Sequence, residues 1–215
     1  MATITAESVI NKARKILNDA GSVRWDNADL LGWLNSGQKE IVLYKPNANT
    51  ETAVITLVEG SVQTVTGLQF IRIISNVASN GTTATSVPSP VEQSVLDGLY
   101  ANWMAVTANA TPKYYCFDRK LLKTFFVYPP QPSSPGKVRV LQSATPAVIL
   151  IGNISSATIL DDIYETPLID YIVYRAFSED TEVIDAAKSD AFFQKFVAAM
   201  GGKAQAETIG EMNAN

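Results

Sequence analysis

The stretch Asp161-Asp162-Ile163-Tyr164-Glu165-Thr166-Pro167-Leu168-Ile169-Asp170-Tyr171 opens the last third of the chain, and this third decides the fold. Thr166-Pro167 predicts a helix start, with proline at the first helical position. Apolar side chains then recur at helical spacing, at Leu168, Ile169, Ile172, Val173 and Ala176. Asp185 is a candidate N-cap for a second, phenylalanine-rich helix that Gly201-Gly202 is expected to close. Residues 161–202 therefore predict a helical hairpin.

Two more helices are predicted at the N-terminus, and both suit packing against this hairpin. The first covers residues 5–20, with Thr5 as its N-cap. The second begins at Asp26 and ends before Pro46, because proline cannot continue a helix. Gly37 lies on the apolar face of the second helix, where a small residue permits another helix to approach closely.

We interpret the basic side chains of the first helix and two tryptophans as structural residues rather than binding residues. We expect Lys12, Arg14 and Lys15 to form a solvated face of the first helix. We expect Trp25 and Trp33 to anchor the core.

The middle of the chain changes to the period of two that is typical of strands. Residues 52–58 and 61–66 flank Glu59-Gly60, a signal for a two-residue hairpin. Five to seven strands are expected, and a stiff proline-rich loop over 129–136 is a candidate for a fixed surface contact. Residues 75–90 predict an exposed loop, and residues 91–112 are the hardest to assign, with a short helix within 91–100.

The sequence therefore predicts an α+β fold, in which N-terminal and C-terminal helices form a bundle around an inserted antiparallel β sandwich or barrel. The expected parts are an N-terminal helical part at 1–50, a β-rich insert at 51–160, a helical hairpin at 161–202 and a flexible tail at 203–215.

Composition limits the possible chemistry. The 215-residue chain contains no histidine, which excludes histidine-dependent triads and histidine metal sites within one chain. One cysteine cannot form an internal disulfide and suits a reducing compartment. The formal charge of −4 argues against a sequence-independent grip on nucleic acid. No segment reaches the length of about 20 apolar residues that a membrane helix needs, and we expect no membrane association.

Three groups of residues are candidate sites. Asp161, Asp162 and Glu165 form a tight acidic cluster, which we interpret as a helix entry rather than a metal site or an acid/base pair. Cys116 lies in an apparent strand and is interpreted as a buried apolar residue, since no histidine can activate it. The basic run Arg119, Lys120 and Lys123 is interpreted as solvated. We therefore predict no catalytic residue, no cofactor and no metal.

Four segments together resemble the head-to-tail adaptor (connector) proteins of tailed bacteriophages. They are AESVI at 6–10 with LLGWLNSGQKEI at 30–41, KTFFVYPPQ at 123–131, IY at 163–164 with LIDYIVYRA at 168–176, and the closing phenylalanine-rich helix. Their order and spacing match along nearly the whole chain, and residues 75–112 depart most. No catalytic signature is among them.

The resemblance implies a structural virion protein of the neck, made in the host cytoplasm. Such a subunit assembles as a ring, commonly a dodecamer, beneath the portal protein, connects capsid to tail proteins and extends the channel through which the genome is ejected. The DNA passes without specific binding. We expect the polar tail to dock on the portal or on a neighbouring subunit, through residues that include Lys203, Gln205, Glu207, Ile209 and Met212.

Two alternatives remain open from the sequence. Another neck or tail component, such as a stopper or a β-rich tail-side module, would attach to the tail and have no direct affinity for a portal. A carboxylate-dependent hydrolase would need two inward-facing carboxylates about 5 to 10 Å apart in a cleft.

Overall fold

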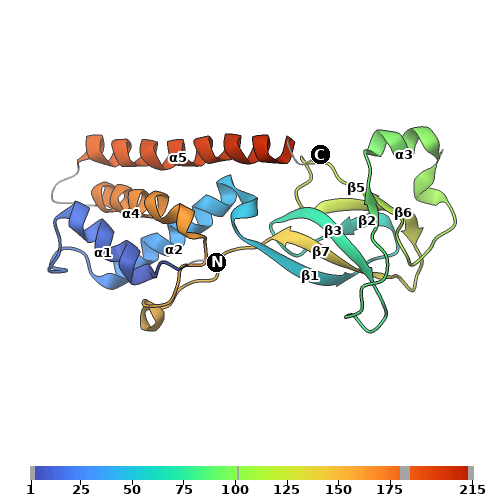
Figure 1. Ribbon diagram of the computed structural model, residues 1–215, viewed down its shortest axis with the longest axis horizontal. Helices are drawn as coiled ribbons and strands as arrows, with labels where there is room; N and C mark the ends of the chain where they lie inside the picture. Colours follow the sequence, from blue (N-terminus) through green and yellow to red (C-terminus); the bar gives the residue numbers. More distant parts are fainter. Residues whose placement is uncertain (1–2, 101, 180–184, 213–215) are drawn as a thin grey trace. The chain divides into compact units, whose positions relative to one another are not determined.

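The computed structural model describes residues 3–100, 102–179 and 185–212, with the backbone alone for residues 202–212. These residues form two compact units. The helical unit contains the described residues up to Asn49 and from Pro146 onward, and the β unit spans Thr50–Thr145 (Figure 1). The expected α+β class is confirmed.

The helical unit is built from two N-terminal and two C-terminal helices with short 3-10 turns between them. Its elements are α1 (Ala6–Leu17), α2 (Asn27–Tyr44), η1 (Pro46–Ala48), η3 (Ile151–Asn153), η4 (Asp162–Tyr164), α4 (Glu165–Glu179) and α5 (Ala186–Met212).

Side-chain caps set the starts of three of these helices as predicted. Thr5 accepts from the backbone N–H of Ser8 at 3.1 Å, and Asp26 accepts from that of Asp29 at 2.8 Å. Asp185 accepts from the N–H of Lys188 at 3.0 Å. Each bond satisfies a donor that the first helical turn leaves without an intrahelical partner.

Helix ends were predicted less well, because several signals can stop a helix. α1 ends at Leu17 with Asn18 in the left-handed conformation, and not at Gly21. α4 begins at Glu165, so that Pro167 is the third helical residue and Thr166 is not the cap. α5 does not stop at Gly201-Gly202 but continues to Met212. Two glycines lower helix propensity without forbidding a helix.

α4 is the central helix of the unit, since it packs against α1, α2 and α5. Its predicted apolar stripe is buried at Leu168, Ile172, Val173 and Ala176. α5 runs alongside α4 and covers it with buried Phe196 and Met200 (Figure 1).

The predicted close approach at Gly37 is also confirmed. A Cβ placed on Gly37 of α2 would lie 3.0 Å from Cδ1 of Tyr171 in α4. Trp33 is buried as expected, and Trp25 packs edge-on against it at 5.2 Å between ring centroids.

The β unit contains seven strands in the described part of the chain, within the predicted range. They are β1 (Thr50–Thr56), β2 (Gly60–Thr64), β3 (Gln69–Val77), β4 (Ser89–Pro90), β5 (Tyr114–Cys116), β6 (Thr124–Gln131) and β7 (Lys137–Ser143). One sheet has the order β1-β7-β3 and is antiparallel. The other has the order β2-β6-β5-β4, in which β4 runs parallel to β5.

The hairpin predicted around Glu59-Gly60 is wrong. β1 pairs with β7 and β2 pairs with β6, so the turn carries the chain from one sheet to the other. Local turn residues cannot distinguish these cases, because the partner strands lie far away in the sequence. The two sheets share one core, which contains Phe70 stacked on Phe125 at 4.3 Å and buried Val127, Val138 and Val140. This is the expected sandwich, and the strands described do not close into a barrel.

The expected surface loop at 129–136 is corrected in its first half. Pro129, Pro130 and Gln131 are buried residues of β6, and the Tyr128-Pro129 bond is cis. Both prolines follow the last β5 pair at Tyr128 and fall where the register of β6 with β2 shifts, and a strand tolerates proline at such an irregularity. Of the region 91–112, which is hardest to assign from sequence, residues Gln93–Leu99 form helix α3, as expected, and Trp103–Ala105 form the 3-10 turn η2, with Leu96 and Trp103 buried.

Candidate interaction surfaces

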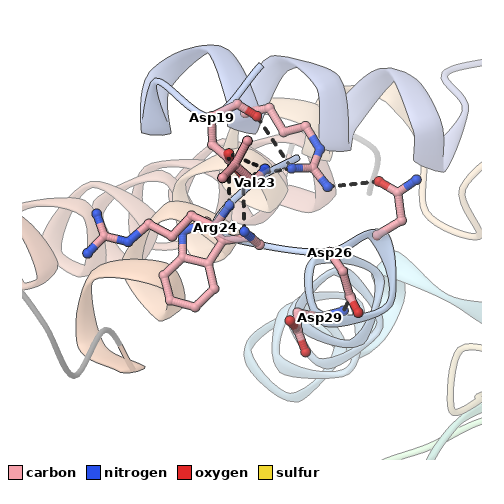
Figure 2. A network of polar contacts seen from close by, with 8 residues as sticks. Asp19, Val23, Arg24, Asp26 and Asp29 are labelled. Atoms are coloured by element: carbon pink, nitrogen blue, oxygen red, sulfur yellow. Dashed lines mark hydrogen bonds and ion pairs between the residues drawn. The ribbon is translucent and has the colours of Figure 1, made fainter. Parts of the chain in front are cut away.

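The turn between α1 and α2 is organised by a buried ion pair. Nη1 of Arg14 donates to Oδ2 of Asp19 at 2.9 Å, and Nη2 donates to Oδ1 of Asn27 at 2.9 Å. The Asp19 carboxylate also accepts from the backbone N–H groups of Val23, Arg24 and Trp25 at 2.8 to 3.1 Å (Figure 2). Arg14 is 4% exposed, so the expected solvated role of this residue is wrong.

The charge of Asp19 is set by opposing influences. Burial is the largest and acts to raise its pKa, because it removes water from the carboxylate. The three backbone donors and Arg14 outweigh it, and the pKa of Asp19 lies below its ordinary value. The anion therefore holds a tight turn whose apolar Val23 is 91% exposed.

The acidic cluster at the entry of α4 attaches the N-terminal segment. Asp162 accepts from the backbone N–H groups of Thr3 at 2.6 Å and Ile4 at 3.1 Å, and from the Thr3 hydroxyl. The hydroxyl bond is the main reason that the pKa of Asp162 is lowered. Glu165 forms an ion pair with Lys12 of α1. The cluster lies at the entry of α4, as expected, but the donors to Asp162 and Glu165 are Thr3, Ile4 and Lys12 rather than the first turn of a helix.

No group of three or more histidine, cysteine, aspartate or glutamate residues within the described ranges is placed to hold a metal ion.

Two amide side chains of α2 hold the segment that leads to α4. Asn35 donates to the carbonyl of Ile149 at 3.0 Å and accepts from its N–H at 2.9 Å. Gln38 accepts from the N–H of Ile159 at 2.9 Å. These roles of Asn35 and Gln38 are not among the expectations from the sequence. A polar amide on an otherwise apolar helix face is the signal that could have revealed them.

The Asn35 bonds fix an exposed apolar ridge on the helical unit. Ile149 is buried, whereas Val148, Leu150 and Ile151 are 55%, 63% and 53% exposed. These three side chains are a candidate protein contact surface.

Cys116 is 2% exposed and lies in an apolar cluster with Leu96 and Trp103. Burial, aided by the charge of Asp97, raises the pKa of the thiol to about 11. The prediction of a buried structural cysteine is confirmed. The predicted solvated run Arg119, Lys120 and Lys123 is exposed as expected.

The residues proposed as a partner-docking tail are placed only by their backbone. Lys203, Gln205, Glu207, Ile209 and Met212 belong to the last turns of α5, and their side chains lie outside the described part of the chain. The structure therefore does not test a contact between them and a partner.

In the part of the chain that the structure describes, no helix is both long and apolar enough to span a bilayer. No curated protein matches the chain. The family model for the SU10 adaptor protein matches residues 4–214, which include both helical ends and the inserted strands. This match confirms the predicted resemblance to bacteriophage adaptor proteins, and the chain belongs to the SU10 adaptor protein family.

Proposed function

We propose that this adaptor-family protein forms a ring beneath the portal of a tailed phage, where it joins the capsid to the tail and extends the DNA channel. The observation that carries the proposal is the family match over residues 4–214. We assign no enzymatic role to the chain. It is made in the host cytoplasm and resides in the neck of the virion.

The charge of the chain supports passage of DNA rather than tight binding. It has 17 basic and 21 acidic residues, so it lacks the basic excess that neutralises phosphates. A channel wall of this kind lets the genome slide during ejection.

The partners on either side are the portal protein and the tail or neck proteins, and the ring is a dodecamer. The ridge of Val148, Leu150 and Ile151 supports protein contacts of this kind.

The proposed role of the tail is docking on the portal or on a neighbouring subunit. α5 has 27 residues and α4 has 15, so α5 can project beyond the helix that it covers. Deletion of residues 203–215 should prevent incorporation into particles while the remaining chain stays folded. Normal incorporation of the truncated protein would remove this part of the proposal.

Genetic deletion tests the functional assignment as a whole. Phage that lacks the gene should yield DNA-containing heads without attached tails, and the protein supplied in trans should restore tailed particles. Tailed infectious particles without the protein would contradict the proposal. Tails that carry the protein but cannot join heads would instead favour a tail-side component.

A further inference from the structure

The charge of the chain is unevenly distributed along its sequence. Residues Thr50–Thr145, which form the β unit, contain seven basic and five acidic residues. The rest of the chain contains ten basic and sixteen acidic residues. The acidic character of the whole chain therefore does not extend to the β unit.

Three cations of the β unit lie on one face of the sheet β1-β7-β3. Lys137 and Arg139 alternate with buried core valines along β7, the middle strand, so their side chains are on the face away from the core. Arg72 of β3 is exposed and lies opposite Leu141 of β7, two residues after Arg139, so it belongs to the same face. We call Arg72, Lys137 and Arg139 the cationic face.

No carboxylate balances these charges within the three strands. The strand neighbours of Lys137 and Arg139 are uncharged, and they are Thr56, Val54, Val77 and Ser75. Glu51 is the one acidic residue of β1, β3 and β7, and it lies opposite Gln142, which bonds to it at 2.8 Å and alternates with the residues of the face. None of the three cations forms an ion pair with a residue that the structure describes.

Neutral carbonyl groups orient two of the cations. Nζ of Lys137 donates to the carbonyl of Ser79 at 3.0 Å, and Nη2 of Arg139 donates to that of Thr82 at 3.1 Å. These bonds do not cancel the charges, and an ammonium or guanidinium group has further donors. The face is therefore ready to receive anions from outside the β unit.

The arrangement of the face favours a polymer of phosphates. Alternate residues of a strand lie about 7 Å apart, so Lys137 and Arg139 offer a row of charges rather than one point. Thr52 and Thr56 are exposed on the same side of β1, and hydroxyl groups join lysine and arginine in contacts with nucleic-acid phosphates. The one aromatic residue of the three strands, Phe70, is buried, so the face lacks the aromatic anchors typical of protein interfaces.

The other basic group of the β unit lacks this setting. Arg119, Lys120 and Lys123 are exposed, but Asp118 directly precedes them in the sequence. Asp118 and Glu92 line the same surface pocket as Arg119. Nearby carboxylates weaken the attraction of a cation for phosphate. The cationic face is therefore the better candidate for an anion contact.

We propose that the cationic face contacts the phosphate backbone of duplex DNA without reading its sequence. That this duplex is the genome in the channel rests on the proposed function. Three cations neutralise at most three phosphates per chain, so the contact is weak and sensitive to salt. Such a contact guides DNA and still lets it pass.

Fluorescence anisotropy of a short labelled duplex with the full-length chain tests the contact. The logarithm of the binding constant should fall with the logarithm of the salt concentration, with a slope no steeper than about −2.7 for three phosphates. The Arg72→Gln, Lys137→Gln, Arg139→Gln triple variant should bind at least about tenfold more weakly at low salt. Absence of salt-sensitive binding by the wild type overturns the proposal.

The matched control is the Arg119→Gln, Lys120→Gln, Lys123→Gln triple variant. It removes the same charge from the same unit but leaves the cationic face intact, so its affinity should change by less than about twofold. Equal losses in the two triple variants would show that net charge alone decides binding, and this overturns the proposal.

A single variant keeps the test valid if the first triple variant does not fold. Arg72 is exposed and its side chain forms no hydrogen bond with a described residue, so Arg72→Gln should leave thermal unfolding unchanged. It should make the salt slope shallower by about 0.9, and Arg72→Lys should retain the slope of the wild type. An unchanged slope in folded Arg72→Gln overturns the proposal.

Assembly on the portal separates this inference from the proposed function. The triple variant of the cationic face should form rings on the portal as the wild type does. Unchanged DNA binding together with lost attachment to portal or tail proteins overturns the inference in favour of an acidic protein partner. DNA binding that depends on the face, in a protein that forms no ring, supports the contact and contradicts the proposed function.

Discussion

Nη1 of Arg14 lies 2.9 Å from Oδ2 of Asp19, and the two side chains are only 5% and 6% exposed. This ion pair closes the turn between α1 and α2, because Asp19 also binds three backbone N–H groups and Arg14 also binds Asn27. The turn between α1 and α2 thus depends on a buried ion pair, and the other partners of Arg14 and Asp19 lie close to them in the sequence.

Asp19→Asn should lower the free energy of unfolding by about 3 kcal/mol, because it leaves Arg14 buried without its counter-ion. An amide also has one acceptor oxygen in place of two. Urea denaturation measures the change. Asp29→Asn is the control, since Asp29 is exposed and should change stability by less than about 0.5 kcal/mol. Equal effects of the two variants would contradict the structural role of Asp19.

The same pair predicts a pH dependence. The pKa of Asp19 is lowered from 3.8 in the folded state, so its contribution to stability is complete above that value. It is lost as the pH falls through the lower folded pKa. The stability difference between wild type and Asp19→Asn should therefore shrink below about pH 4. A difference that stays constant down to the acid transition would contradict this.

Gly37 and Gly32 make a matched pair on α2. A Cβ at Gly37 would lie 3.0 Å and 3.2 Å from ring atoms of buried Tyr171, whereas a Cβ at Gly32 would meet nothing within 4 Å. Gly32→Ala should stabilise the protein by about 0.5–1 kcal/mol through helix propensity. Gly37→Ala should destabilise the protein by about 1 kcal/mol, because the cost of overpacking the new methyl group against Tyr171 exceeds the gain in helix propensity. Thermal unfolding of both variants checks the signs, and stabilisation by both would show that α2 and α4 are not in close contact.

Asn35→Ala should cost about 2 kcal/mol or more, because it removes the partners of the N–H and carbonyl of buried Ile149. Neighbouring Ser36→Ala is the control, since that hydroxyl is exposed and bonds only to the Gly32 carbonyl of its own helix. Hydrogen exchange should also accelerate at Ile149 in the first variant alone. Unchanged protection there would refute the bonds described.

The rate at which the Cys116 thiol is alkylated should report unfolding of the protein. A rise of its pKa from 9.0 to about 11 lowers the thiolate fraction at pH 8 by about 100-fold, and the thiolate is the reactive form. Iodoacetamide should label the thiol at least about 100-fold faster in urea than in buffer. A Ser133→Cys variant, exposed in the folded protein, should react rapidly in both. Rapid labelling of native Cys116 would contradict its burial.

Features carried by neighbouring residues were predictable from the sequence. The caps at Thr5, Asp26 and Asp185 depend on one side chain and the next helical turn. The close approach at Gly37 follows from its place on an apolar stripe. The α+β class follows from the change of hydrophobic period along the chain.

Features that depend on distant or combined partners were not predictable. β1 pairs with β7, more than 80 residues away, so the hairpin that Glu59-Gly60 predicts between β1 and β2 is wrong. Arg14 is charged and appears suited to solvent until the turn supplies Asp19.

The most direct test of the ring assignment is single-particle imaging of this protein mixed with the portal protein encoded by the same genome. We predict a closed ring of subunits stacked coaxially on the portal, with its central channel continuous with that of the portal. Two folded proteins that fail to associate, or a contact without a closed ring, would contradict it.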